Sequence, residues 1–113
     1  MQDWNAYQES LLGRVGELAR LSPDVLRGLH TVEGSAARTG KLEPKMHELI
    51  ALAVAVTTRC DGCIAVHSKK AVKLGAAPEE IAEALGVAIA LNAGAALTYS
   101  ARVFDAIAGL PKA

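Results

Sequence analysis

The stretch TTRCDGCIAVHSKK, residues 57–70, contains both cysteines of the 113-residue chain and one of its three histidines. Apolar residues at helical spacing precede and follow it. Its first three residues, Thr-Thr-Arg, form helix poorly because two of them are β-branched. We therefore expect one helix to end here and another to begin at about Asp61, which puts the two cysteines at a helix start.

Helical patterns of apolar residues fill most of the remaining chain, and no alternating pattern typical of strands persists. We expect helices over about residues 4–20, 23–39, 44–56, 61–74 and 78–108. The Ser22-Pro23 pair is typical of an N-cap followed by a first-turn proline, and Gly75 suits a helix end. Residues 92–94, Asn-Ala-Gly, are expected to kink or divide the last helix. The sequence therefore predicts one all-α domain over residues 1–113.

The composition and charge bear on which kinds of molecule the chain could bind. Hydrophobic residues make up 51% of the chain and aromatic residues only 4%, which suits closely packed helices. The 12 basic and 12 acidic residues balance, so the total charge supports neither nucleic-acid nor anionic-membrane binding. The polar N-terminal stretch, residues 1–10, is unlike a secretory signal, and we therefore expect a cytoplasmic protein.

The apolar content also predicts where surface is buried. The most apolar window, residues 81–97, is short for a membrane span, so we expect a buried core helix and no membrane. A small monomer buries only a modest fraction of its surface. So much Ala, Val and Leu in a short chain therefore predicts a homo-oligomer in which apolar surface is buried between subunits.

Both cysteines lie where a helix start would make thiols reactive. Cys60 is expected at or beside the N-cap, where unpaired N–H groups and the helix dipole favour a thiolate. Cys63 falls in the first turn of the same helix, and two cysteines at this spacing can close a disulfide. In a reducing cytoplasm such a pair is more often catalytic or metal-binding than structural. The residues between them, Asp61 and Gly62, are small and should leave a partner free to approach.

His67 and Glu48 are the candidate proton-transfer groups. His67 follows Cys63 by four residues, so both lie on one helix face and the imidazole can take the thiol proton. Glu48 lies in an apolar run, where a buried carboxylate must be paired or protonated. If the two helices form a hairpin, Glu48 can face the Cys63–His67 pair and complete a proton relay. The alternative is that Glu48 is an ordinary exposed helix residue.

A zinc site is the main competing interpretation of the Cys-x-x-Cys motif. Closed structural zinc sites have four ligands. Cys60, Cys63 and His67 supply three, and only Glu48 or one of the other two histidines could be the fourth. Because the chain has no second Cys-x-x-Cys, we expect no bound metal and interpret the other two histidines as structural residues.

These residues together resemble the carboxymuconolactone decarboxylase family, and more narrowly its alkylhydroperoxidase D-like (AhpD-like) branch. The resemblance rests on Glu48, Cys60-Asp61-Gly62-Cys63 and His67, followed by Lys73-Leu74-Gly75-Ala76 and Glu79-Glu80-Ile81-Ala82-Glu83-Ala84. It covers about residues 42–107, which is most of the chain.

The resemblance implies an all-helical fold and thiol-dependent peroxidase or disulfide-reductase chemistry with an antioxidant role, without metal, flavin or haem. By position, Cys63 would be the attacking thiol, which a hydroperoxide oxidises to a sulfenic acid, and Cys60 would close the disulfide. Glu48 and His67 would form the proton relay through a water. Some members carry a histidine directly before the second cysteine. Gly62 stands there in this chain, so one relay or tuning group is absent.

The same resemblance implies a homotrimer or homohexamer. The implied partners are a small hydroperoxide or a partner disulfide protein, and a dithiol reductant. Two other functions stay open. A γ-carboxymuconolactone decarboxylase would remove CO2 from a ring lactone and would need neither Cys60 nor Cys63. A non-enzymatic oligomer would use the two cysteines as a redox sensor or a zinc clip.

Overall fold

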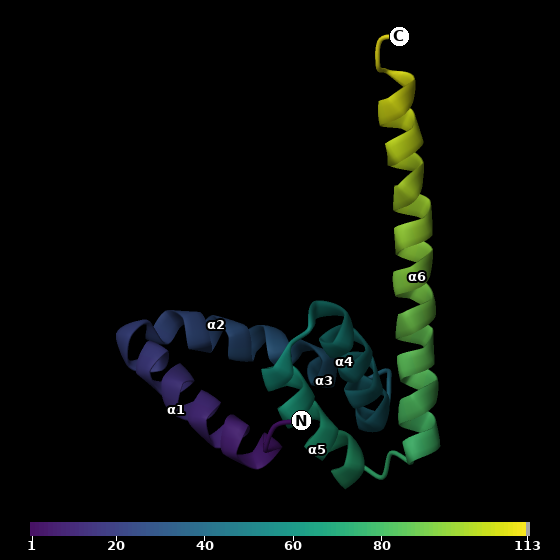
Figure 1. Ribbon diagram of the computed structural model, residues 1–113. Coiled ribbons are helices and arrows are strands. Elements are labelled where there is room, and N and C mark those ends of the chain that lie inside the picture. Colours follow the sequence, from purple (N-terminus) through teal and green to yellow (C-terminus); the bar gives the residue numbers. More distant parts are fainter. Residues whose placement is uncertain (113) are drawn as a thin grey trace.

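The computed structural model describes residues 1–112 and confirms the expected all-α fold (Figure 1). Every regular element in that part of the chain is a helix. The helices are α1 (Trp4–Leu21), α2 (Pro23–Glu33), α3 (Ser35–Thr39), α4 (Pro44–Thr58), α5 (Asp61–Lys73) and α6 (Pro78–Ala108).

Helices α4, α5 and α6 form the centre of the molecule, with α4 packed against both of the others. The buried cluster contains Leu49, Leu52, Ala71 and Ala76, and Ile81 and Ala84 pack against it. Half of these side chains are alanines, which let helices approach closely but remove little apolar area from water. The core of a single chain is therefore small.

Helices α1 and α2 form a second hairpin, and α1 lies beside α5 (Figure 1). We predicted one helix from Pro23 to about Thr39, but the structure divides it at Gly34 into α2 and α3. Glycine is a weak helix former, which favours a break there. The Arg38 guanidinium then turns back and donates a hydrogen bond to the Thr31 carbonyl at 2.6 Å, which satisfies an acceptor near the end of α2.

The long helix α6 is continuous, so the predicted kink or division at residues 92–94 is wrong. The Asn92 side-chain amide donates to the Ala88 carbonyl at 2.7 Å and to the Thr57 hydroxyl at 2.9 Å. The first bond stays within the helix, and the second joins α6 to the end of α4. Asn92 therefore ties the two helices together instead of breaking one.

The second half of α6 projects away from the other helices (Figure 1). The radius of gyration is 19.0 Å, whereas a compact domain of this length has about 13 Å. The accessible surface is 8836 Å², whereas a compact monomer of 11.7 kDa exposes about 5,900 Å². A single chain thus exposes roughly 3,000 Å² more than a compact monomer of its size would.

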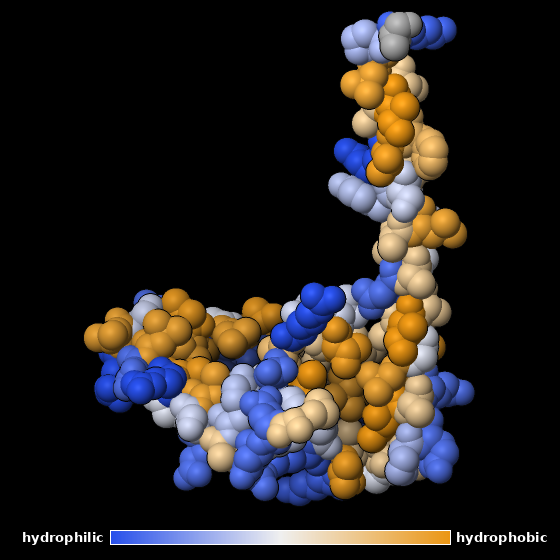
Figure 2. All heavy atoms as spheres, viewed as in Figure 1, coloured by the Kyte–Doolittle hydropathy of each residue, from blue (hydrophilic) through white to orange (hydrophobic). Residues whose placement is uncertain are grey.

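Apolar side chains follow α6 over much of its length (Figure 2). By length and composition α6 could cross a membrane, since its most apolar window has a mean hydropathy of 1.6. Only 6% of that window is buried within the chain. Our prediction that this segment is a buried core helix is therefore wrong for the single chain, because α4 covers only one side of the first half of α6.

Candidate functional site

The turn between α4 and α5 reverses the chain just before Cys60. The backbone N–H groups of Arg59 and Cys60 both donate to the Ala55 carbonyl, the second at 3.0 Å. Arg59 has a φ of 54°, in the left-handed region that favours glycine. The break that we predicted is therefore present, and its sharpness comes from one residue in a strained conformation.

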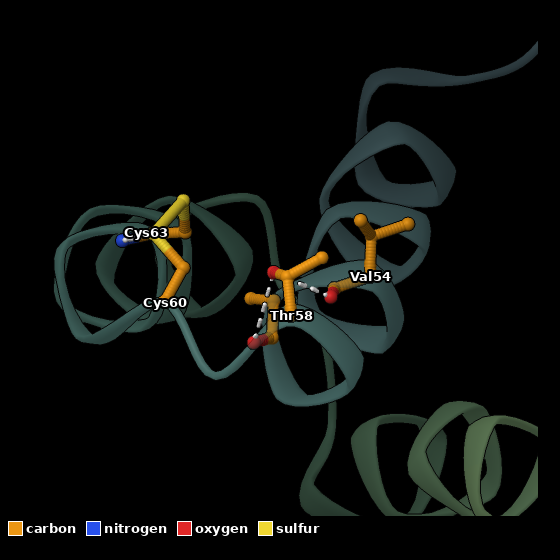
Figure 3. The surroundings of a disulfide bond; sticks show 5 residues. Val54, Thr58, Cys60 and Cys63 are labelled. Atoms are coloured by element: carbon orange, nitrogen blue, oxygen red, sulfur yellow. Dashed lines mark hydrogen bonds between the residues drawn. A yellow bond between two sulfur atoms is a disulfide. The ribbon is translucent and has the colours of Figure 1, made fainter. Parts of the chain in front are cut away.

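Helix α4 extends slightly further than we expected, through Thr58. The Thr58 hydroxyl donates to the carbonyls of Val54 at 3.0 Å and Ala55 at 3.4 Å (Figure 3). The Thr57 hydroxyl likewise donates to the Ala53 carbonyl at 2.9 Å. Such bonds from a threonine hydroxyl to a carbonyl of the preceding turn slightly weaken a helix, which agrees with the end of α4 at Thr58.

Cys60 is the N-cap residue of α5, and it forms a disulfide with Cys63 in the first turn (Figure 3). The Cys63 backbone N–H donates to the Cys60 sulfur at 3.1 Å, while the Ile64 N–H donates to the Cys60 carbonyl at 3.0 Å. The Cys60 sulfur thus takes the place of the oxygen of an ordinary N-cap side chain. Both cysteines are partly exposed.

Glu48 on α4 and His67 on α5 face each other across the hairpin. The distance between Glu48 Oε2 and His67 Nδ1 is 2.6 Å, and the side chains are 13% and 30% exposed. When Nδ1–H donates to the carboxylate, Nε2 keeps its lone pair and can accept a proton. His67 lies one turn beyond Cys63 on the same helix face, so an imidazole bonded to a carboxylate follows the two cysteines along α5.

A hollow of about 670 Å³ lies on one side of the Glu48–His67 pair. Its lining also includes His47 and Lys70, which no sequence pattern connects with this pair. We interpreted His47 as structural, yet it precedes Glu48 directly and borders the same hollow. Most of the other lining residues come from the end of α2, from α3 and from the loop after it, far from His67 in the sequence, so no local motif predicts this hollow.

One of the two residues between the cysteines, Gly62, lies against helix α1. A Cβ atom added to Gly62 would lie 2.7 Å from Leu11 Cδ2 of α1. The Gln2 amide donates to the Asp61 carboxylate at 3.4 Å, and the Lys69 ammonium donates to the side chain of Gln8. Helix α1 thus lies beside Gly62, whereas Asp61 is exposed.

Within residues 1–112, no group of three or more His, Cys, Asp or Glu side chains is arranged to hold a metal ion. The two sulfurs bond to each other and His67 bonds to Glu48, so the candidate zinc ligands of the sequence analysis do not converge. The arrangement brings together a thiol pair, an imidazole and a carboxylate, which are the groups needed for thiol redox chemistry with proton transfer.

Comparisons with known sequences agree with one another. The family model described as the carboxymuconolactone decarboxylase family matches residues 23–106. An uncharacterized protein from Haemophilus influenzae is 48% identical over 104 residues, which cover 92% of each chain. A protein from Paracoccus denitrificans, described as uncharacterized protein 4 in the cox locus, is 35% identical over 98 residues, 84% of this chain and 88% of that one.

Two solved structures resemble the fold. The crystal structure of a carboxymuconolactone decarboxylase family protein from Legionella pneumophila is 33% identical, with a TM-score of 0.73. The match covers 91% of this chain and 92% of that one. A crystal structure from Methanobacterium thermoautotrophicum has a TM-score of 0.68 and 31% identity, over 79% of this chain and 97% of that one.

Proposed function

This chain belongs to the carboxymuconolactone decarboxylase family, and we propose that within it the chain acts as an AhpD-like, thiol-dependent oxidoreductase. One observation carries the proposal: the Cys60–Cys63 pair sits at the start of α5, and the Glu48–His67 pair lies one turn further along. The proposed reaction is the reduction of a hydroperoxide or a disulfide in the cytoplasm, with an antioxidant role.

The peroxide half of the proposed cycle starts from the reduced thiols. The Cys63 thiolate attacks the terminal oxygen of a hydroperoxide and becomes a sulfenic acid, and the O–O bond breaks to release an alcohol. His67, oriented by Glu48, takes the thiol proton and delivers it to the leaving alkoxide. The Cys60 thiol then attacks the Cys63 sulfur, which releases water and closes the disulfide. A dithiol reductant restores both thiols and is itself oxidised to a disulfide.

A peroxide-consumption assay tests this proposal. Purified wild type is mixed with a small hydroperoxide and candidate dithiols, dihydrolipoamide among them, and compared with Cys60→Ser and Cys63→Ser. Steady turnover in wild type and none in either variant supports the proposal. If both variants perform as wild type in every assay, the thiols are dispensable and the decarboxylase alternative, which needs no dithiol, replaces it.

We also propose that the exposed apolar surface of α6 is covered by further copies of the same chain. The excess surface of roughly 3,000 Å² is more than a standard interface takes from one partner, about 800 Å², so one small contact would not remove it. Contacts with several neighbours would cover it, as in a homotrimer or homohexamer. A purified chain that stays in solution only with detergent would point to a membrane instead.

A further inference from the structure

The two sulfurs of the disulfide have different hydrogen-bond partners. The Cys63 backbone N–H donates to the Cys60 sulfur at 3.1 Å, whereas the Cys63 sulfur accepts no hydrogen bond from residues 1–112. The donor belongs to the first turn of α5, where a backbone N–H has no partner within the helix. The Cys60 sulfur is therefore the one that the backbone at the helix start holds.

This bond favours a negative charge on Cys60. An N–H donor stabilises a thiolate more than a neutral thiol, and the positive end of the helix dipole acts in the same direction. The charged neighbours in the chain, Arg59 and Asp61, have opposite signs, and both are exposed, so their effects on the sulfur oppose each other. The backbone at the start of α5 is thus the feature that sets a Cys60 thiolate apart from an ordinary one.

Cys63 depends on a different group. Its own N–H is bonded to the Cys60 sulfur, and the titratable side chain that shares its helix face is His67, one turn further along. In thiol–disulfide exchange the thiol of lower pKa leaves faster. Both cysteines are partly exposed, so neither end of the disulfide is closed to a small thiol. The difference between the two leaving groups then decides where the bond opens.

We infer that a reducing thiol attacks the Cys63 sulfur and that Cys60 leaves as a thiolate held by the backbone N–H of residue 63. This assignment rests on the proposed redox function and identifies the sulfur at which the reductant enters. It gives the N-cap bond a role in the reduction of the disulfide, separate from the role of the Glu48–His67 pair in the reaction with peroxide.

The exchange is balanced in two steps. A thiolate of the reductant bonds to the Cys63 sulfur, the bond between the two cysteines breaks, and its electron pair stays on Cys60. A second thiol then attacks the sulfur of the reductant in the mixed disulfide, and Cys63 leaves and takes up a proton. Two electrons and two protons pass to the chain, and the reductant leaves as a disulfide.

Mapping the mixed disulfide on the oxidised full-length chain tests this assignment. The chain is mixed with a monothiol, either 2-mercaptoethanol or the larger glutathione, and is quenched with acid early in the reaction. Alkylation of the free thiol at low pH then prevents further exchange. Trypsin cuts after Arg59 and Lys69, so both cysteines lie in one peptide, residues 60–69. Fragmentation between them, at Asp61 and Gly62, shows by mass which cysteine carries the monothiol.

Both monothiols should be found on Cys63 about tenfold more often than on Cys60. The ratio should be the same in His67→Gln, because the first step needs no proton from the imidazole. Equal amounts on the two cysteines, or an excess on Cys60, overturn the assignment. A preferred cysteine that changes between the two monothiols also overturns it, since access to the sulfur would then decide. A ratio that falls to one in His67→Gln would assign the effect to the imidazole and not to the backbone.

The mapping also separates this assignment from the proposed function. An excess on Cys60 shows that the disulfide exchanges with thiols, so the redox function stands while the assignment falls. A disulfide that reacts with neither monothiol contradicts the redox function and the assignment with it. No step uses peroxide, so a chain that fails to consume peroxide refutes the peroxidase proposal and leaves the mapped ratio standing.

Discussion

Among single residues, Glu48 carries an acidic group into a helix with mostly apolar neighbours, and only 13% of its side chain is exposed. A carboxylate so placed is costly unless it has a partner. His67 supplies that partner at 2.6 Å, and in return the carboxylate fixes which ring nitrogen carries the proton. The burial of Glu48 and the proposed orientation of the His67 ring thus have one physical origin.

Replacing Glu48 or His67 with glutamine should slow peroxide reduction by roughly 10²–10⁴-fold, as is usual for general acid–base groups. Both thiols should remain titratable, because neither variant touches the cysteines. The matched control is His47→Gln, since His47 borders the same hollow but lies outside the Glu48–His67 pair. Rates are measured by hydroperoxide consumption. Full activity in Glu48→Gln would remove Glu48 from the mechanism.

Arg59 gives a second prediction for a single residue. Its φ of 54° is costly for any side chain with a Cβ atom. Arg59→Gly should therefore raise the free energy of unfolding by up to about 1 kcal/mol, after the larger entropy of glycine in the unfolded chain is subtracted. Arg59→Ala keeps the Cβ atom and should leave the free energy of unfolding unchanged. Urea denaturation of the three proteins measures the difference, and an equal gain in both variants would show that the arginine side chain, not its backbone, is the cause.

The sequence was sufficient to select Glu48, Cys60, Cys63 and His67, because local spacing and helix periodicity place them around one hairpin. It could not reveal the contact of Leu11 with Gly62, which depends on how α1 packs on a helix about fifty residues later in the chain. Local patterns predict which residues share an element, whereas contacts between distant elements depend on the whole packing arrangement.

At the scale of the helices, the beginning of α6 is held by its own first turn and by α4. The Glu80 carboxylate accepts the Ala77 backbone N–H at 2.9 Å and pairs with the Lys45 ammonium at 2.9 Å. The Ala77 hydrogen bond and then Lys45 hold the pKa of Glu80 below its ordinary value of 4.5. The bond to Glu80 raises the pKa of Lys45 above 10.5.

These two pKa shifts make the free energy of unfolding depend on pH. Because the pKa of Glu80 is lower in the folded chain, its contribution is complete above about pH 4.5 and is lost as the pH falls through the folded value. Because the pKa of Lys45 is higher in the folded chain, its contribution is complete below 10.5 and is lost as the pH rises further.

Wild type should therefore exceed Glu80→Gln in melting temperature between about pH 5 and pH 10, and the difference should shrink towards pH 3. Thermal unfolding followed by circular dichroism measures it. Glu79→Gln is the matched control, because Glu79 stands in the same first turn but the Ala77 N–H bonds to Glu80. A difference that stays constant down to pH 3 would show that the Glu80 contacts do not depend on its charge.

Most helix boundaries were predictable, since Pro23, Pro44 and Pro78 each stand at the first position of a helix. Two predictions about helix continuity were wrong. The helix expected over residues 23–39 is divided at Gly34, and the break expected at residues 92–94 is absent. Gly34 ends α2 because Arg38 supplies a side-chain bond that replaces a lost helical one. Asn92, which we expected to disturb α6, instead bonds within the helix and to Thr57.

At the scale of the whole molecule, no other helix among residues 1–112 packs against the last third of α6. Tyr99 and Phe104 are 69% and 74% exposed, and Arg102 stacks over the Tyr99 ring at 5.0 Å from its centroid. Side chains this large are normally buried or placed at interfaces. The sequence indicated surplus apolar surface, and the structure shows that the projecting helix α6 carries eight of the large apolar side chains that are exposed.

We predict that the chain is a homo-oligomer at micromolar concentration and that Phe104→Asp dissociates it, because a charge would be buried without a partner. Light scattering should give a trimer or hexamer for wild type and a much smaller mass for the variant. Val32→Asp is the control, since Val32 is exposed on α2, outside the proposed interface. A wild-type mass of 11.7 kDa would contradict the proposed assembly.

The proposed chemistry depends on unequal roles of the two thiols, and trapping of the sulfenic acid tests these roles most directly. Each single serine variant is treated with hydroperoxide and dimedone, and the labelled residue is identified by mass spectrometry. We predict a label on Cys63 in Cys60→Ser, where the sulfenic acid forms but cannot close a disulfide, and no label in Cys63→Ser. A label on Cys60 in Cys63→Ser, with none on Cys63 in Cys60→Ser, would reverse the assignment. No label in either variant, together with full activity of both, would contradict the thiol mechanism itself.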